Sequence, residues 1–118
     1  MKEQFDHLFL KDSNVPSGDV YEIYASAAKK LWDKYSDTYE LRPKSPKKVK
    51  EAKNREVEFY KDGKHIAQIA IGKTTTIYVL DDFLRSKLRL VYNQAPNGRY
   101  RHTFDTFEEC MEAIEGVM

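Results

Sequence analysis

Residues 55–80 read REVEFYKDGKHIAQIAIGKTTTIYVL, and this stretch decides the fold. Asp62-Gly63 is a strong signal for a two-residue turn, and it separates two strand-like runs at 55–61 and 64–71. Gly72-Lys73 marks a second turn, and the run from Thr74 to Leu80 that follows is rich in β-branched residues. The sequence therefore predicts two tandem hairpins that form a three-stranded antiparallel meander.

Two-residue turns would also fix which side chains share a face of this meander, because side chains alternate along a strand. The better core face is predicted to carry Val57, Phe59, Ile66, Gln68, Ala70, Ile77 and Val79. The second face is predicted to carry Tyr60, His65, Ala67, Ile69, Tyr78 and Leu80, with Glu56 and Glu58 at its edge. That second face is half apolar, so it needs a cover from the N-terminal arm, from the basic segment or from another molecule.

Helices and further strands flank the meander. An apolar stripe at three- and four-residue spacing predicts a helix over 19–36, and a capping box at Thr106 and Glu109 predicts a helix at the C-terminal end. Short strands are expected at 39–42 and 99–104, and a helix with Ser45 as its cap is one alternative for 45–53. Residues 82–93 fit either a helix or a strand, and we favour a helix capped by Asp81 or Asp82.

The expected fold is therefore α+β, a small antiparallel sheet built on a three-stranded meander, with two or three helices packed mainly on one face. Residues 1–118 are expected to form a single domain, in which 1–17 are an arm and loop and 42–55 are a basic segment.

Composition excludes several classes of protein. Hydrophobic residues make up 41% of the 118 residues and charged residues 33%, which is typical of a globular chain. No apolar run approaches the roughly 20 residues of a membrane helix, and the acidic start is not that of a signal peptide. Cys110 is the only cysteine, so a cytoplasmic protein without membrane contact is expected.

Charge is balanced in sum but segregated along the chain. The formal net charge is only +1, unlike that of a strongly basic nucleic-acid-binding protein. Five acids and no Lys or Arg lie in 105–118. The basic segment is the opposite, with Glu51 alone opposing Arg42, Lys44, Lys47, Lys48, Lys50, Lys53 and Arg55.

Three local motifs have alternative interpretations. Residues 67–74 resemble a phosphate-binding loop with alanine in place of the first glycine, but the strand-like run after Lys73 favours a plain hairpin. Ser45-Pro46-Lys47-Lys48 resembles both the minor-groove-binding repeat of linker-histone tails and a proline-directed kinase site, and a solvated basic loop is the alternative. Arg99 and Arg101 share one face of a strand and suit phosphate or single-stranded nucleic acid, unless they only protect a sheet edge.

Catalytic and metal-binding motifs are sparse. His7, His65 and His102 lie in different elements without metal-binding spacing, and Cys110 falls on the apolar stripe of the last helix. No cofactor, metal site or catalytic residue is predicted, and a non-enzymatic role is favoured. A site assembled only by the fold is the alternative, since catalytic groups need not be close in sequence.

Three functions from different classes remain open. The first is a small accessory protein, an adaptor, regulator or inhibitor in the style of a phage or mobile element, that binds a protein partner or a second copy through Tyr60, His65, Ile69 and Tyr78. The second is a nucleic-acid-binding accessory protein that uses the basic segment with Arg99 and Arg101. The third is an enzyme or small-molecule binder with a site near Tyr60, His65 and Tyr78.

Overall fold

A six-stranded antiparallel sheet with three helices makes up the computed structural model, which describes residues 19–44 and 55–118. The strand order across the sheet is β1-β2-β3-β4-β6-β5. Along the chain the elements are α2 (Asp19–Tyr35), β1 (Glu40–Lys44), β2 (Arg55–Lys61), β3 (Lys64–Ile71), β4 (Thr75–Val79), α3 (Asp82–Lys87), β5 (Asn93–Gln94), β6 (Tyr100–Phe104) and α4 (Phe107–Ile114). The expected α+β class and antiparallel meander are confirmed.

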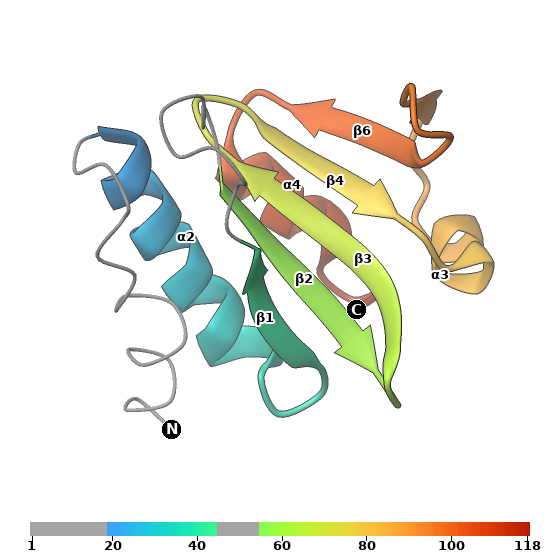
Figure 1. Cartoon of the computed structure of the whole chain (residues 1–118), viewed down its shortest axis with the longest axis horizontal. Coiled ribbons are helices and arrows are strands. Elements are labelled where there is room, and N and C mark those ends of the chain that lie inside the picture. Colours follow the sequence, from blue (N-terminus) through green and yellow to red (C-terminus); the bar gives the residue numbers. More distant parts are fainter. Residues whose placement is uncertain (1–18, 45–54) are drawn as a thin grey trace.

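In the view of Figure 1, α4 lies behind the sheet and α2 runs along its left side, so the front face carries no helix among the described residues. The core fills the space between these helices and the rear face of the sheet. Buried apolar side chains from both helices pack there against strand residues, chiefly Tyr24, Leu31, Trp32, Tyr35, Leu41, Val57, Phe59, Ile69, Ile71, Ile77, Val79, Phe104 and Ile114. Burial of this apolar surface is the main stabilising contribution to the fold.

The register of the meander differs from the sequence prediction. Tyr60 pairs with His65 as the Asp62-Gly63 turn requires, but the register then shifts and Phe59 pairs with Ala67. Ile66 is the extra residue, as in a β-bulge. The second connection spans Gly72 to Thr74, one residue longer than predicted, because Ile71 pairs with Thr75.

These two changes correct the predicted faces. Ile69 lies on the helix-covered face beside Ile77 and is fully buried, so the expectation that it belongs to an interaction surface was wrong. Ala67 also lies on the helix side, whereas Gln68 and Ala70 lie on the helix-free face. The physical reason is that the bulge moves an isoleucine instead of a glutamine into the core, where a polar amide would be costly.

The helix within residues 82–93 is also shorter than predicted. Helix α3 ends at Lys87, and Leu88 has an extended backbone with φ −78° and ψ 115°. Leu88 is buried and Leu90 and Tyr92 are half-buried, while Arg89 and Val91 between them are exposed. An extended backbone turns every second side chain, those of Leu88, Leu90 and Tyr92, towards the core, and the chain continues into β5.

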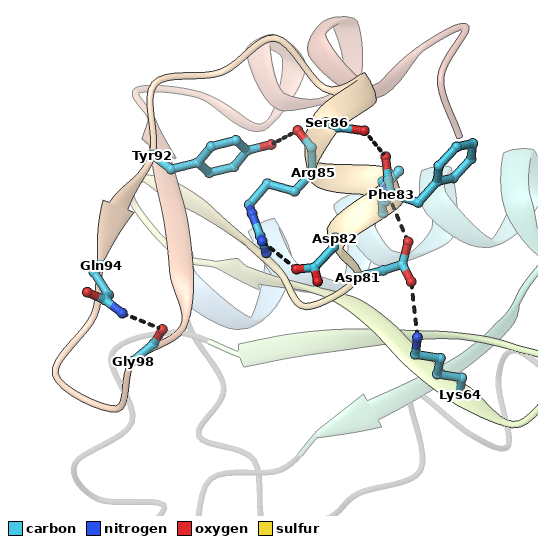
Figure 2. Close-up of polar contacts among 10 residues, drawn as sticks. Lys64, Asp81, Asp82, Phe83, Arg85, Ser86, Tyr92, Gln94 and Gly98 are labelled. Atoms are coloured by element: carbon cyan, nitrogen blue, oxygen red, sulfur yellow. Dashed lines mark hydrogen bonds and ion pairs between the residues drawn. The ribbon is translucent and has the colours of Figure 1, made fainter.

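The predicted caps at Asp81 and Thr106 form. The Leu84 backbone N–H donates to Asp81 Oδ2 at 2.9 Å, and the Glu109 backbone N–H donates to Thr106 Oγ1 at 3.2 Å. Figure 2 shows Asp81 at the start of α3, with Lys64 on its other carboxylate oxygen. Side-chain acceptors of this kind satisfy N–H groups that have no partner within the helix.

We expect Ile69→Ala to lower the free energy of unfolding by about 2–5 kcal/mol, because it leaves a cavity between the sheet and the helices. Urea unfolding followed by circular dichroism measures the change. Thr76→Ala, at a half-buried position on the other face, is the control and should cost less than about 1 kcal/mol. A small effect of Ile69→Ala would contradict the shifted register.

Candidate functional site

A row of polar side chains crosses the helix-free face at one level of the sheet. Successive strand pairings align Arg42 with Glu58, Glu58 with Gln68, Gln68 with Tyr78 and Tyr78 with Arg101. Directly paired residues point to the same side of a sheet, so five neighbouring strands each contribute one member of this polar row. All five members are polar or charged, although the row crosses the centre of the sheet.

Aromatic rings lie beside one end of the polar row. The rings of Tyr60 and His65 stack with centroids 4.8 Å apart, and the Arg42 guanidinium lies 4.1 Å from the centre of the Tyr60 ring. Glu58 accepts from the Tyr60 hydroxyl at 3.4 Å and lies 3.8 Å from Nε2 of His65. A hydrogen bond to Glu40 raises the pKa of the exposed Arg42 side chain, so Arg42 stays charged.

A pocket of about 250 Å³ lies at the other end of the polar row. The side chains that line it come from four strands and from the turn between β5 and β6, and they are Glu56, Gln68, Tyr78, Ala95, Pro96, Asn97, Arg99 and Arg101. We refer to it as the arginine pocket. It joins Arg99 and Arg101, which the sequence singled out, to the predicted interface residue Tyr78.

The turn that forms one wall of the arginine pocket is held by several hydrogen bonds. The Gly98 backbone N–H donates to the Ala95 carbonyl at 2.8 Å, and the Ala95 N–H donates to the Arg99 carbonyl at 2.7 Å. Gly98 has φ +86°, a conformation that favours glycine. The Gln94 side chain donates to the Gly98 carbonyl at 3.1 Å, as Figure 2 shows. The turn is therefore shaped before any ligand arrives.

The other predicted site residues are dispersed. Lys44 ends β1 and Arg55 begins β2, so the two ends of the basic segment belong to adjacent strands, with Lys44 paired to Glu56. Lys47, Lys48, Lys50, Lys53 and the N-terminal arm lie outside the described residues. Tyr60 and His65 lie together, whereas Tyr78 is aligned with Gln68 in the arginine pocket.

Sequence reasoning missed Gln68 and Asn97 as pocket residues. Gln68 was assigned to the core face, and Asn97 was treated only as part of a turn. The Asn97-Gly98 pair was the available signal, since a tight turn at that point must project its side chains beside the strands it joins.

The motif at 67–74 forms a hairpin, as the preferred interpretation predicted. Gly72 to Thr74 connect two strands, and β4 follows in place of the helix that a phosphate-binding loop requires. A separate pocket of about 440 Å³ lies between this hairpin, α2 and the start of α4. Its charged lining mixes Lys30 and Lys73 with Asp105 and Glu108, and Lys30 already pairs with Glu108 at 3.5 Å.

His102, Cys110 and Tyr35 are titratable side chains that lie outside the polar row. His102 Nδ1 lies 2.8 Å from the Val91 carbonyl, apart from His65. Burial raises the pKa of the Cys110 thiol to about 12, which opposes formation of a nucleophilic thiolate. Burial also raises the pKa of Tyr35 to about 12. In residues 19–44 and 55–118, no three His, Cys, Asp or Glu side chains gather where they could hold a metal ion.

Comparison of the chain with protein-family models, with curated protein sequences and with solved structures found no match. None of the helices in the described part of the chain is long and apolar enough to cross a membrane. A functional conclusion therefore depends on the chain's own residues.

We expect the free energy of unfolding to fall as the pH rises from 9 towards 12, because the unfolded thiol of Cys110 ionises near 9 and the folded one near 12. The folded state binds the proton more tightly in that window, so deprotonation favours unfolding. Urea unfolding of the wild type and of Cys110→Ala at pH 7, 9 and 10.5 measures the effect. The decline above pH 9 should be smaller in the variant, and equal slopes would contradict the assignment.

Proposed function

We propose that the protein is a non-enzymatic accessory protein that binds a protein partner through the helix-free face of its sheet. The observation that carries the proposal is the polar row, which crosses this face from Arg42 to Arg101. A sheet face that only had to be solvated would not need aligned aromatic, amide and guanidinium groups. Tyrosine and arginine are also the side chains that contribute most to binding at protein interfaces.

The balance of charge on this face supports a protein partner. Arg42, Arg99 and Arg101 are opposed by Glu40, Glu56 and Glu58. A nucleic acid would favour an excess of cations, whereas a protein surface can complement both signs. The mixed pattern also gives directional specificity, because a partner in the wrong orientation would bring like charges together.

The size of the face sets a limit on the interface. Six strands spaced about 4.8 Å apart span roughly 24 Å, and strands of this length cover roughly 20 Å, so the face offers about 500 Å². A stable interface takes about 800 Å² from each partner. The partner must therefore also contact the rim of the sheet, where the β5–β6 turn and the ends of β1 and β2 lie.

We expect the double variant Arg42→Ala with Tyr60→Ala to bind the partner at least ten-fold more weakly than the wild type does. The pair lies on the face but outside the arginine pocket, and its removal deletes a cation–π contact and a ring stack. Cross-linking in lysate of the source organism, followed by quantitative mass spectrometry, identifies proteins captured by the wild type. Arg89→Ala with Phe83→Ala is the matched control, since both side chains are exposed and neither belongs to the polar row.

Two results complete that test. Sedimentation equilibrium of the purified protein shows whether the partner is a second copy, in which case the mass doubles and the double variant restores the monomer. Equal capture of every protein by the wild type, the double variant and the control would overturn the proposal. Circular dichroism confirms that each variant is folded.

A second candidate function is binding of single-stranded nucleic acid. The specific observation is the guanidinium of Arg42 over Tyr60, which itself stacks on His65, because bases stack on such platforms. If this function is correct, fluorescence anisotropy with single-stranded RNA or DNA should show binding that weakens steeply with salt. Changing Lys47, Lys48, Lys50 and Lys53 to alanine should then reduce both the affinity and the salt slope. Unchanged values would exclude the basic segment from that role.

A further inference from the structure

Arg99 and Arg101 line the arginine pocket together with a single carboxylate, that of Glu56. Both side chains are half-buried, and within the described part of the chain neither makes an ion pair or a cation–π contact. By contrast, the cations Arg85, Lys64 and Arg42 all pair with carboxylates. Two guanidinium groups against one carboxylate leave the lining with an excess of positive charge. That excess favours an oxyanion, which each guanidinium can bind through two hydrogen bonds.

Gln68 places a second requirement on a ligand of the arginine pocket. Its side chain lines the same pocket and the residue is only 2% exposed, yet its Oε1 is buried and accepts no hydrogen bond. Leaving a buried acceptor unsatisfied is unfavourable, so native proteins rarely retain one without a reason. A carboxylate alone would not satisfy this oxygen, because a carboxylate brings only acceptors. The group that fits must also carry a donor.

The geometry of the turn adds donors in fixed positions. Asn97 Oδ1 accepts from the Arg99 backbone N–H at 3.0 Å, which directs the Asn97 amide nitrogen away from that bond. The Tyr78 hydroxyl can donate or accept. Because the Ala95–Gly98 turn is already closed by hydrogen bonds, these groups need little ordering when a ligand binds.

We infer that the arginine pocket binds a carboxylate whose neighbouring carbon bears an N–H donor, as in a free α-amino acid or in the C-terminal residue of a polypeptide. The carboxylate is held by Arg99 and Arg101, and the N–H donates to Gln68 Oε1. About 250 Å³ is smaller than the 300 Å³ or more of most drug-sized sites, and it suits one residue. For a polypeptide terminus the inference rests on the proposed function, whereas for a free amino acid it stands alone.

The test is a calorimetric and NMR titration of the full chain with small probes. The set comprises glycine, leucine, glutamate and lysine, their N-acetyl forms, the N-acetyl amides, acetate and inorganic phosphate. We expect at least one amino acid or N-acetyl amino acid to bind at least ten-fold more tightly than acetate, with shifts of the Gln68 side-chain amide signals. The corresponding N-acetyl amide, which has no carboxylate, should not bind.

The arms of the titration distinguish the two sources of the ligand. Binding of N-acetyl forms as well as free amino acids identifies the chemistry of a polypeptide terminus, since the acetylated nitrogen is an amide N–H. Binding of free amino acids alone identifies a small-molecule site. Tighter binding of phosphate than of every carboxylate, or no binding by any probe, would overturn the inference.

Three variants assign the interactions to residues. Arg99→Ala with Arg101→Ala should reduce binding of the best probe at least ten-fold, whereas Arg89→Ala should not. Gln68→Met keeps the size of the side chain and removes the acceptor, so it should weaken the best probe towards the affinity of acetate and leave acetate unchanged. If Gln68→Met alters neither, the role of the N–H donor is wrong. If the wild type binds no probe but still captures a partner through Arg42 and Tyr60, this inference is rejected and the proposed function stands.

Discussion

Burial of the helix-facing side of β3 is the constraint on which the rest of the structure depends. Ile69 and Ile71 are fully buried between the neighbouring strands and the helices. Their position fixes the register of the sheet, since a slip of one residue would exchange its two faces. Gln68 must then point to the opposite side, and the same register aligns Tyr78 and Arg101 with it. The polar row is therefore a consequence of core packing.

Local signals predicted the elements well because each depends on residues close in sequence. Asp62 and Gly63 have φ values of +52° and +79°, as a tight turn between twisted strands requires. The caps at Asp81 and Thr106 likewise involve an acceptor and an N–H three residues apart. The bulge at Ile66 has no comparable local signal. It is decided by which alternative buries Ile69, which depends on helices far away in the chain.

The candidate site was only partly predictable for the same reason. Alternation along a strand was enough to place Arg99 and Arg101 on one face, and in the structure both line the same pocket. Their neighbours could not be derived, because β6 lies beside β4 and the chain reaches it only after α3 and β5. That strand order brings the Asn97 turn next to Gln68 of β3. No spacing within the sequence encodes this approach.

The two sides of the molecule differ in how their charges are satisfied. The acidic C-terminal segment lies in α4 and at its end, where Glu108 and Glu115 pair with Lys30 and Lys34 of α2 at 3.5 and 3.2 Å. These exposed pairs contribute little stability, but they neutralise the helical side. On the sheet side, Arg99 and Arg101 have no such partner among the described residues, and a buried amide oxygen of Gln68 accepts no bond. Polar groups that folding leaves without a partner lower the stability of the folded state. A ligand that forms hydrogen bonds or ion pairs with these groups removes that cost, and the gain contributes to the free energy of binding.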